Sequence, residues 1–391
     1  MNETDCTIVG ASFAGLACAT ALAHAGMQVT VLEKKADVGE KLHTTGIIVK
    51  DAIDQVAILD RLPTALVRRI TGVRLYAPNL QHVDLAAPGY YFLATDTPQV
   101  MRWLADEAGK AGARIEYRAL FREAKRIQSG FDLGEFGTTR FLVGADGPNS
   151  AVAKAFGLGR SGQFLFGLEH EYSGVEIAEP DMLHCFVDRR LAPGYIGWIV
   201  AAPGGVQVGL AQRLRGQRRP AVEAIEEFLK KIAPIFDLRG VRPTSVRAGM
   251  IPCGGIVRPV AARRVLLTGD AAGMVSPVTA GGIHNALKHG LAAGHAIADY
   301  LSGKREDPSG WFVSSYPRFR VKRVLRFLFD HFQSDALFDL LLRTKLVRTA
   351  AGIVYFHHKG VFDPETRPQE AGTPEQGHAS DELKRADGAG R

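Results

Sequence analysis

A glycine-rich turn near the N-terminus constrains the fold of this chain more than any other feature. It joins a short apolar run, residues 5–9, to a helix-favouring run, residues 16–25, through the sequence Gly10-Ala11-Ser12-Phe13-Ala14-Gly15. Glycines let a backbone approach a pyrophosphate closely, and the N-terminus of a helix favours the anion. Glu33 ends the next strand-like run, where a carboxylate accepts hydrogen bonds from ribose hydroxyls. The pattern predicts a dinucleotide site built on a strand, a turn and a helix.

Two later segments repeat the arrangement of a buried strand followed by a polar turn. The first runs from Phe141 to Ala145 and continues as Asp146-Gly147-Pro148-Asn149-Ser150. The second runs from Val265 to Thr268 and continues through Gly269-Asp270, Pro277 and Gly281-Gly282 into an alanine-rich helix. Taken in this order, the three segments resemble the FAD-contacting segments of flavoenzymes built like para-hydroxybenzoate hydroxylase and the geranylgeranyl reductases.

The resemblance implies FAD as the cofactor. It implies that Asp270 binds a ribityl hydroxyl and that the amides around Gly281 and Gly282 face the pyrimidine edge of the flavin. A helix N-terminus carries about half a positive charge, which suits the negative charge of a reduced flavin there. The positions with an implied role in cofactor binding are Gly10, Ser12, Phe13, Ala14, Gly15, Glu33, Lys34, Lys41, Asp146, Gly269, Asp270, Pro277, Gly281, Gly282 and Ile283.

The chain is long enough for one compact unit of two interleaved domains. We expect an α/β fold with a discontinuous, Rossmann-like FAD-binding domain and a β-rich substrate domain with an antiparallel sheet. Short strand-like runs divided by glycine and proline favour the second domain. The expected FAD-binding domain comprises residues 1–72, 95–160 and 250–305, and the substrate domain residues 73–94 and 161–249. Helices are expected over residues 306–362 and a disordered tail over residues 363–391.

The four cysteines are scattered without a C-x-x-C pair, which argues against a disulfide framework, a zinc site and a flavin–disulfide reductase. No metal site and no nucleic-acid partner is predicted. The charged region that opens a signal peptide is missing, so we expect a cytoplasmic protein.

A net charge of +7 weakly favours acidic partners or a membrane surface. Residues 318–328 interleave arginine and lysine with valine, leucine and phenylalanine. This segment reads either as a helix that packs its apolar side on the body of the protein, or as an amphipathic helix in peripheral contact with the inner face of the membrane.

The third segment favours the geranylgeranyl reductase branch of the resemblance, because Gly269–Gly273, Pro277, Gly281-Gly282 and Ile283 fit its pattern. That branch also carries an aromatic strand motif lining an isoprenoid pocket, of which Tyr195 and Trp198 remain. Aromatic residues in a strand also serve simply as core. Reduction of an alkene requires a positioned substrate and a proton source, for which His43 and His284 are the candidates.

Three functions follow as hypotheses. The first is an FAD-dependent oxidoreductase that transfers hydride between flavin and a hydrophobic, isoprenoid- or lipid-like substrate. Its electron donor is NAD(P)H, ferredoxin or a quinol, a choice left open because Ala153 stands where the family usually carries an arginine. Thr97 likewise stands where related enzymes often carry an arginine near the cofactor. The second is a flavin monooxygenase that hydroxylates an aromatic or polyketide-like substrate through a C4a-hydroperoxide. The third is a non-catalytic flavin-binding partner.

Overall fold

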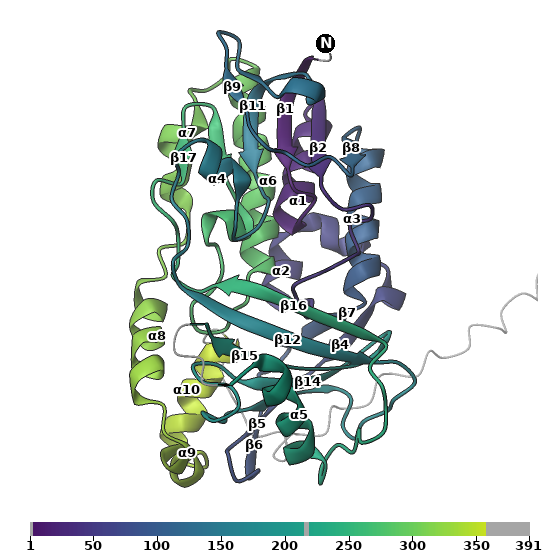
Figure 1. Cartoon of the computed structure of the whole chain (residues 1–391), viewed down its shortest axis with the longest axis vertical. Helices are drawn as coiled ribbons and strands as arrows, with labels where there is room; N and C mark the ends of the chain where they lie inside the picture. Colours follow the sequence, from purple (N-terminus) through teal and green to yellow (C-terminus); the bar gives the residue numbers. More distant parts are fainter. Residues whose placement is uncertain (1–2, 215–218, 357–391) are drawn as a thin grey trace, which may run out of the picture.

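A mixed sheet of mainly parallel strands forms one end of the molecule (Figure 1). The computed structural model describes residues 3–214 and 219–356 of the chain. Within these residues the sheet has the order β17-β18-β11-β1-β2-β8; in addition, β10 pairs with β11, and β9 pairs with β10. The strands are β1 (Glu3–Val9), β2 (Val29–Glu33), β8 (Arg114–Tyr117), β9 (Lys125–Arg126), β10 (Phe131–Asp132), β11 (Thr138–Gly144), β17 (Ala261–Ala262) and β18 (Val265–Leu267).

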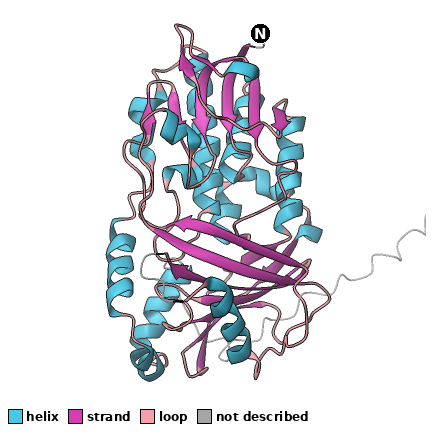
Figure 2. Ribbon diagram, in the orientation of Figure 1, coloured by secondary structure: helices cyan, strands magenta, loops and turns pink. Residues whose placement is uncertain are grey.

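Helices cover this sheet (Figure 2). Helix α1 (Phe13–His24) is buried on almost every side because α3 (Thr97–Lys110) and α6 (Ile283–Leu301) both pack against it. Two glycines of α6 make the close contact with α1 possible. A methyl group at Gly290 would lie 2.4 Å from the carbonyl oxygen of Ala14, and one at Gly294 would lie 2.6 Å from that of Cys18. The smaller helices here are α2 (Lys50–Gln55) and α4 (Ala151–Ala155).

A second sheet, mostly antiparallel, forms the other end of the molecule (Figure 1). Its order in the described chain is β16-β12-β15-β14-β13-β5-β6, and α5 (Ala221–Ile232) packs against it. Its strands are β5 (Gly72–Tyr76), β6 (His82–Leu85), β12 (Phe164–Tyr172), β13 (Met182–Phe186), β14 (Gly197–Ala202), β15 (Gly205–Arg213) and β16 (Ser245–Pro252). A small third sheet pairs β7 (Phe92–Thr95) with β3 (Ile47–Val49) and β4 (Val67–Ile70).

The expected α/β fold with an antiparallel second sheet is confirmed. Strand β7 belongs to the small three-stranded sheet and not to the seven-stranded sheet. From the sequence, residues 73–94 were expected to lie in the substrate domain. Strand β16 begins at Ser245 and pairs along its whole length with β12, across the expected boundary at residue 250.

Short helices follow α6; the first lies beside β17 of the first sheet, and the others lie beside the second sheet (Figure 1). They are α7 (Pro308–Trp311), α8 (Arg320–Phe332), α9 (Asp335–Leu341) and α10 (Lys345–Phe356). Across residues 3–214 and 219–356, no helix combines the length and apolar character needed to cross a bilayer. The tail expected at residues 363–391 lies outside the described residues.

Candidate functional site

The three predicted cofactor segments meet at one edge of the parallel sheet. Val9 of β1 is in register with Leu32 of β2 and with Gly144 of β11, and Gly144 is in register with Leu267 of β18. The residues that follow these strands therefore emerge side by side. The carboxyl edge of parallel strands is where open α/β sheets bind their ligands.

Gly10 brings the first and second segments into direct contact. Its φ of +99° lies in the region that L side chains rarely adopt. A methyl group at this position would lie 2.5 Å from the carbonyl oxygen of Ala145 and 2.9 Å from the Cα atom of Asp146. The structure requires glycine here because the two backbones leave no room for a side chain.

Hydrogen bonds to Ser12 and Glu33 fix the backbone around the start of α1. The Ser12 hydroxyl caps the helix and accepts a hydrogen bond from the Gly15 amide at 3.2 Å. The Glu33 carboxylate accepts hydrogen bonds from the amides of Ala11 and Lys35, both at 2.9 Å. Ionised carboxylates accept about four hydrogen bonds, so Glu33 retains capacity for a hydroxyl donor.

Asp146 has a buried oxygen without a partner. Its Oδ2 atom accepts hydrogen bonds from the amides of Ala151 and Val152 at the start of α4. Its Oδ1 atom is buried and has no hydrogen-bond donor within the described residues. Burial raises the pKa of this carboxyl, while hydrogen bonds from Ser150 and from these amides oppose the shift. Such an orphaned acceptor calls for a donor from outside the protein.

Asp270 lies beside the start of α6. A methyl group at Gly282 would lie 3.5 Å from Oδ1 of Asp270, and one at Gly269 would lie 3.0 Å from Cβ of Ala14. Among the described residues, no hydrogen bond reaches the Asp270 carboxylate, and burial raises the pKa of Asp270 to about 6. Pro277 is buried in the loop that precedes α6, Gly281 is exposed, and Ile283 is the first residue of the helix.

Tyr195 and Trp198 lie against the same loop. The Tyr195 hydroxyl donates a hydrogen bond to the carbonyl oxygen of Thr279, and the two aromatic rings meet edge to face with centroids 6.4 Å apart. Both rings pack with Ala280 around a small buried apolar cluster. The fold thus brings the predicted pocket aromatics next to the predicted flavin edge, although about eighty residues separate them in sequence.

The two candidate histidines are held by different elements. The Nδ1 atom of His43 lies 2.6 Å from the carbonyl oxygen of Ala248 on β16. Because a carbonyl only accepts, Nδ1 carries the proton and Nε2 can exchange one. His284 lies on α6, with its Nε2 atom 3.2 Å from Oε1 of Gln55 on α2. Lys34 and Lys41 are exposed on the loop before His43.

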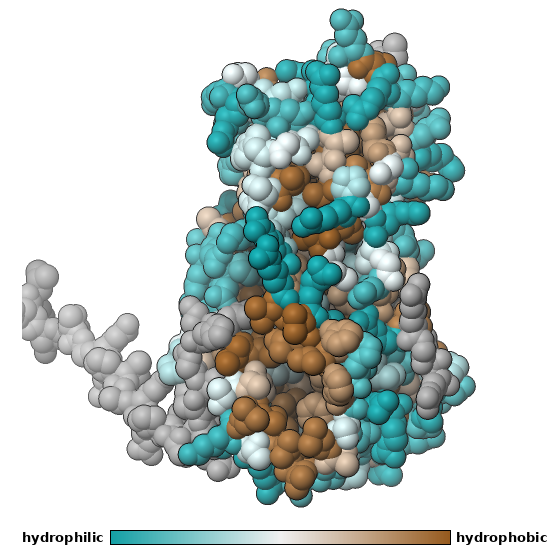
Figure 3. Space-filling view, turned by 90° about the vertical axis from the view of Figure 1, so that its left-hand side faces the viewer, coloured by the Kyte–Doolittle hydropathy of each residue, from teal (hydrophilic) through white to brown (hydrophobic). Residues whose placement is uncertain are grey.

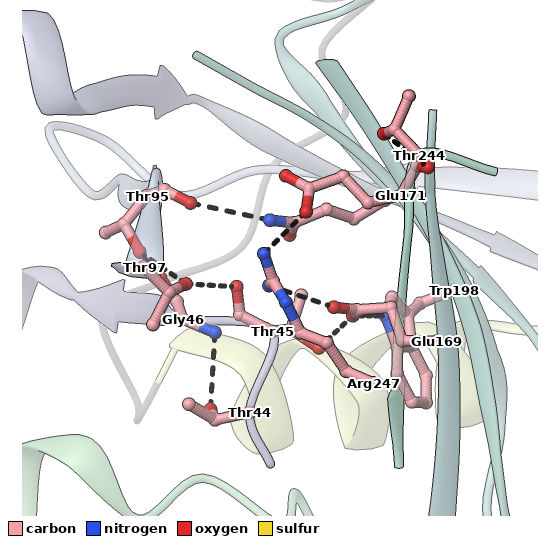
Figure 4. A network of polar contacts seen from close by, with 11 residues as sticks. Thr44, Thr45, Gly46, Thr95, Thr97, Glu169, Glu171, Trp198, Thr244 and Arg247 are labelled. Atoms are coloured by element: carbon pink, nitrogen blue, oxygen red, sulfur yellow. Dashed lines mark hydrogen bonds and ion pairs between the residues drawn. The ribbon is translucent and has the colours of Figure 1, made fainter. Parts of the chain in front are cut away.

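A buried polar network holds this loop against the second sheet (Figure 4). Glu169 of β12 accepts hydrogen bonds from Thr45 at 2.6 Å and from the Trp198 indole at 2.9 Å. Arg247 of β16 lies 3.3 Å from Glu169 and 2.7 Å from Glu171. Glu169 and Arg247 are 4% and 7% exposed. Burial raises the pKa of Glu169, against the opposing effects of Thr45, Arg247 and Trp198.

Two threonines complete this network on the cofactor side. Thr97 donates a hydrogen bond to the carbonyl oxygen of Thr45 at 3.0 Å, and Thr95 donates one to that of Gly46 at 2.8 Å. Thr97 thus anchors the loop at the position where related enzymes were expected to carry an arginine. Sequence reasoning missed Glu169, Arg247 and Thr45. The signal for Glu169 was the presence of two glutamates at alternate positions of a largely apolar strand, which places both on one face of the sheet.

The residues at this edge fit a dinucleotide. The turn at Gly10 exposes its backbone, Asp146 holds an unpartnered buried oxygen, and Asp270 holds a carboxylate without a protein donor beside the N-terminus of α6. Acceptors of this kind suit the hydroxyls of ribose and ribityl chains, and helix N-termini suit phosphate and reduced flavin.

Comparison with known proteins agrees with this assignment. The model of the FAD binding domain family matches residues 3–324. Digeranylgeranylglycerophospholipid reductase 2 of Methanopyrus kandleri is 30% identical over 329 residues, which cover 80% of this chain and 81% of the relative. Digeranylgeranylglycerophospholipid reductase of Methanocaldococcus jannaschii is 26% identical over 337 residues, covering 84% of each chain.

A solved structure shares the fold. The crystal structure of a geranylgeranyl bacteriochlorophyll reductase-like protein from Thermoplasma acidophilum superposes with a TM-score of 0.78 at 18% identity. The match covers 92% of this chain and 98% of that protein.

Proposed function

Because the chain belongs to the FAD binding domain family and is a distant homologue of digeranylgeranylglycerophospholipid reductases, we propose that it transfers hydride between FAD and a carbon–carbon double bond of an isoprenoid- or lipid-like substrate. The chain is an FAD-dependent oxidoreductase. The substrate, the direction of transfer and the residues that take part are the proposal.

FAD supplies the hydride chemistry when bound. Gly10, Ser12 and Gly15 would receive its pyrophosphate at the N-terminus of α1, and Glu33 would accept from a ribose hydroxyl. Asp270 would orient the ribityl chain. The amides at the start of α6 would offer positive charge to the ring.

The observation that carries the proposal is the hydrogen bond from Tyr195 to Thr279, beside the apolar cluster against which Tyr195, Trp198 and Ala280 all pack. In this position the two aromatic rings would exclude water and hold an apolar chain beside the flavin edge. His43 is the favoured proton donor, since the Ala248 carbonyl fixes its ring and leaves Nε2 to exchange a proton.

The experiment that tests this proposal uses FAD-loaded protein, reduced chemically without oxygen and mixed with a lipid that carries geranylgeranyl chains. Mass spectrometry should find products that have gained one pair of hydrogens for each double bond reduced. Recovery of unaltered prenyl lipid would contradict the proposal. Oxygen-dependent hydroxylation of an aromatic or polyketide-like compound would instead identify a monooxygenase.

Asp270→Asn is expected to weaken FAD binding about tenfold or more, since it removes a charged acceptor. It should also change the stability of the FAD-free protein. The raised pKa of Asp270, about 6, means that the folded protein binds this proton more tightly than the unfolded chain. Stability is therefore favoured at low pH and falls as the pH rises from about 4 through about 6. In Asp270→Asn, the stability of the FAD-free protein should no longer decrease over this pH range because of this group.

Asp270 is only partly buried, so we expect the variant to gain about 2 kcal/mol of stability above about pH 7. Urea unfolding of the FAD-free protein at several pH values measures this gain, and titration with FAD measures affinity. Asp106→Asn, at an exposed position of α3, is the isosteric control. Unchanged FAD affinity in Asp270→Asn would contradict the assigned role.

We also propose that the C-terminal helices touch a membrane surface. Helix α8 exposes Val321, Leu328 and Phe332 at 72%, 45% and 69%, and α9 exposes Leu340 at 74%. Figure 3 shows hydrophobic side chains gathered over this face of the molecule. Basic residues interleave with the apolar ones on α8, which suits anionic headgroups.

Replacing both Val321 and Phe332 by aspartate is expected to lower binding to anionic vesicles by at least about a hundredfold, because burial of each apolar side chain is worth about 1.5–3 kcal/mol and about 1.4 kcal/mol corresponds to a factor of ten. Co-sedimentation with phosphatidylglycerol vesicles measures this binding. Val222→Asp is the matched control, since Val222 on α5 is 60% exposed and lies outside the C-terminal helices. Equal sedimentation of the double variant and wild type would remove the proposal.

A further inference from the structure

A large basic cavity lies between α8 and the neighbouring end of the second sheet. Its volume is about 1610 Å³, above the roughly 300–1000 Å³ typical of small-molecule sites. Seven arginines and two aspartates are among the residues that line it. Arg320, Arg323 and Arg326 come from one face of α8, and the others are Arg189, Arg190, Arg213 and Arg219. The lining thus carries a strong excess of positive charge.

One part of the cavity wall is a fixed ion-pair cluster. Asp330 of α8 pairs with Arg213 from the end of β15 and with Arg326 one turn earlier on the same helix. These contacts attach α8 to the sheet. By contrast, within residues 3–214 and 219–356 no acidic side chain pairs with Arg189, Arg320 or Arg323. Their charge is available to a ligand.

Two buried side chains of the wall carry donors without an acceptor. Arg326 and Gln333 are 4% and 5% exposed. Both are anchored on Gly194: an Arg326 Nη2 atom donates to its carbonyl, and the Gln333 Oε1 atom accepts from its amide. The Arg326 Nε and Gln333 Nε2 atoms are buried and have no hydrogen-bond partner among the described residues.

Fixed, unmet donors in a basic cavity call for an anion with several acceptor oxygens. A water molecule could meet one such donor, but it would not balance the surrounding guanidinium charge. Phosphate groups combine negative charge with several acceptors, and arginine recognises them through paired hydrogen bonds.

The cavity also has an apolar part. Phe164, Leu214, Val324 and Phe327 contribute to its lining, and Val324 and Phe327 are 61% and 56% exposed. Cys253 lines the cavity and also belongs to the buried cluster against which Tyr195 and Trp198 pack. The cavity therefore abuts the proposed substrate pocket.

We propose that this cavity binds the phosphate-bearing head of an amphiphile, with the apolar chain leading toward Tyr195 and Trp198. The inference rests on the proposed function, because it names the polar end of the same substrate. Arg320 and Arg323 contribute charge, and Arg326 and Gln333 contribute fixed donors.

The test is calorimetric titration of the FAD-loaded protein with dihexanoyl phosphatidic acid below its micellar concentration. Gln333→Glu keeps the acceptor for the Gly194 amide but replaces the free donor by a negative oxygen. It should raise the dissociation constant at least tenfold, as should Arg320→Ala combined with Arg323→Ala. Arg122→Ala combined with Lys125→Ala removes two exposed charges at the β9 end of the molecule and should leave affinity unchanged (Figure 1).

Two further ligands identify the source of the recognised group. Dihexanoylglycerol, which lacks the phosphate, should not bind, and glycerol 3-phosphate should bind more weakly than the phosphatidic acid. Equal affinity for glycerol 3-phosphate would identify a free-phosphate site and overturn the amphiphile assignment. Unchanged affinity in the variants, or no binding by wild type, would overturn the site itself.

Binding and turnover separate the two proposals. Binding that the variants weaken, in a protein that leaves prenyl chains unaltered, would retain the cavity site and remove the proposed function. Reduction of prenyl lipids by wild type, with affinity unaffected in the variants, would remove the cavity site and retain the proposed function.

Discussion

Replacing Gly10 by alanine is expected to give a protein that no longer retains FAD. The alanine must adopt a φ near +99°, which costs a non-glycine residue about 1–2 kcal/mol. Its methyl group would also lie 2.5 Å from the Ala145 carbonyl oxygen, a backbone atom that cannot rotate away. The first and second segments must then separate, and the turn that receives the pyrophosphate opens. We expect a total loss of stability above about 2 kcal/mol.

Flavin absorbance of the purified variant measures retention, and thermal unfolding measures stability. Gly26→Ala is the matched control, since Gly26 has a similar φ of +78° but nothing lies within 4 Å of an added methyl group. Gly26→Ala should lose only the stability that the unfavourable φ angle costs, about 1–2 kcal/mol, and should retain FAD. Full flavin content in Gly10→Ala would show that the two segments do not meet as described.

Replacing Glu169 by alanine is expected to destabilise the protein by about 3–5 kcal/mol, because it leaves Arg247 buried with one carboxylate fewer. The Thr45 hydroxyl and the Trp198 indole lose their acceptor at the same time. These contacts hold the loop of His43 and Thr45 on the second sheet, so the variant should also lose activity more than its stability alone explains. Chemical denaturation and steady-state kinetics measure the two effects.

A double-mutant cycle separates the ion pair from the other contacts. Arg247→Met combined with Glu169→Ala should be less destabilised than the sum of the two single variants, since neither Glu169 nor Arg247 then remains buried without the other. Glu171 loses Arg247 equally in the Arg247→Met single variant and in the double variant. Glu169→Gln should retain the hydrogen bond from Thr45 and lose less stability than Glu169→Ala. A cost below about 1 kcal/mol for Glu169→Ala would mean that the network does not anchor the loop.

The cofactor edge could be predicted in detail because its determinants are local. Strand, turn and helix follow one another within about thirty residues, and only glycine meets the φ and the contacts found at Gly10. Parallel strands then place Gly10, Asp146 and Asp270 at one edge, whichever loops connect them. Short strand-like runs were expected in the substrate domain as well, and β12 is one of its strands.

The substrate side could be predicted only in part. Tyr195 and Trp198 were expected from a degenerate motif, but the hydrogen bond from Tyr195 to Thr279 and the apolar cluster shared with Ala280 depend on how the second sheet meets the start of α6. The position of His43 likewise depends on Ala248, which lies on a strand about two hundred residues later.

By itself, the sequence determined the cofactor fold of this protein, because glycine positions, strand periodicity and helix capping act over short stretches of chain. The tertiary structure alone decided which distant polar groups pair with one another. Glu169 and Arg247 neutralise each other across neighbouring strands, whereas Arg326 and Gln333 retain donors without an acceptor. Whether a buried charge is balanced depends on partners that only the packed sheet and helices bring within a few ångströms.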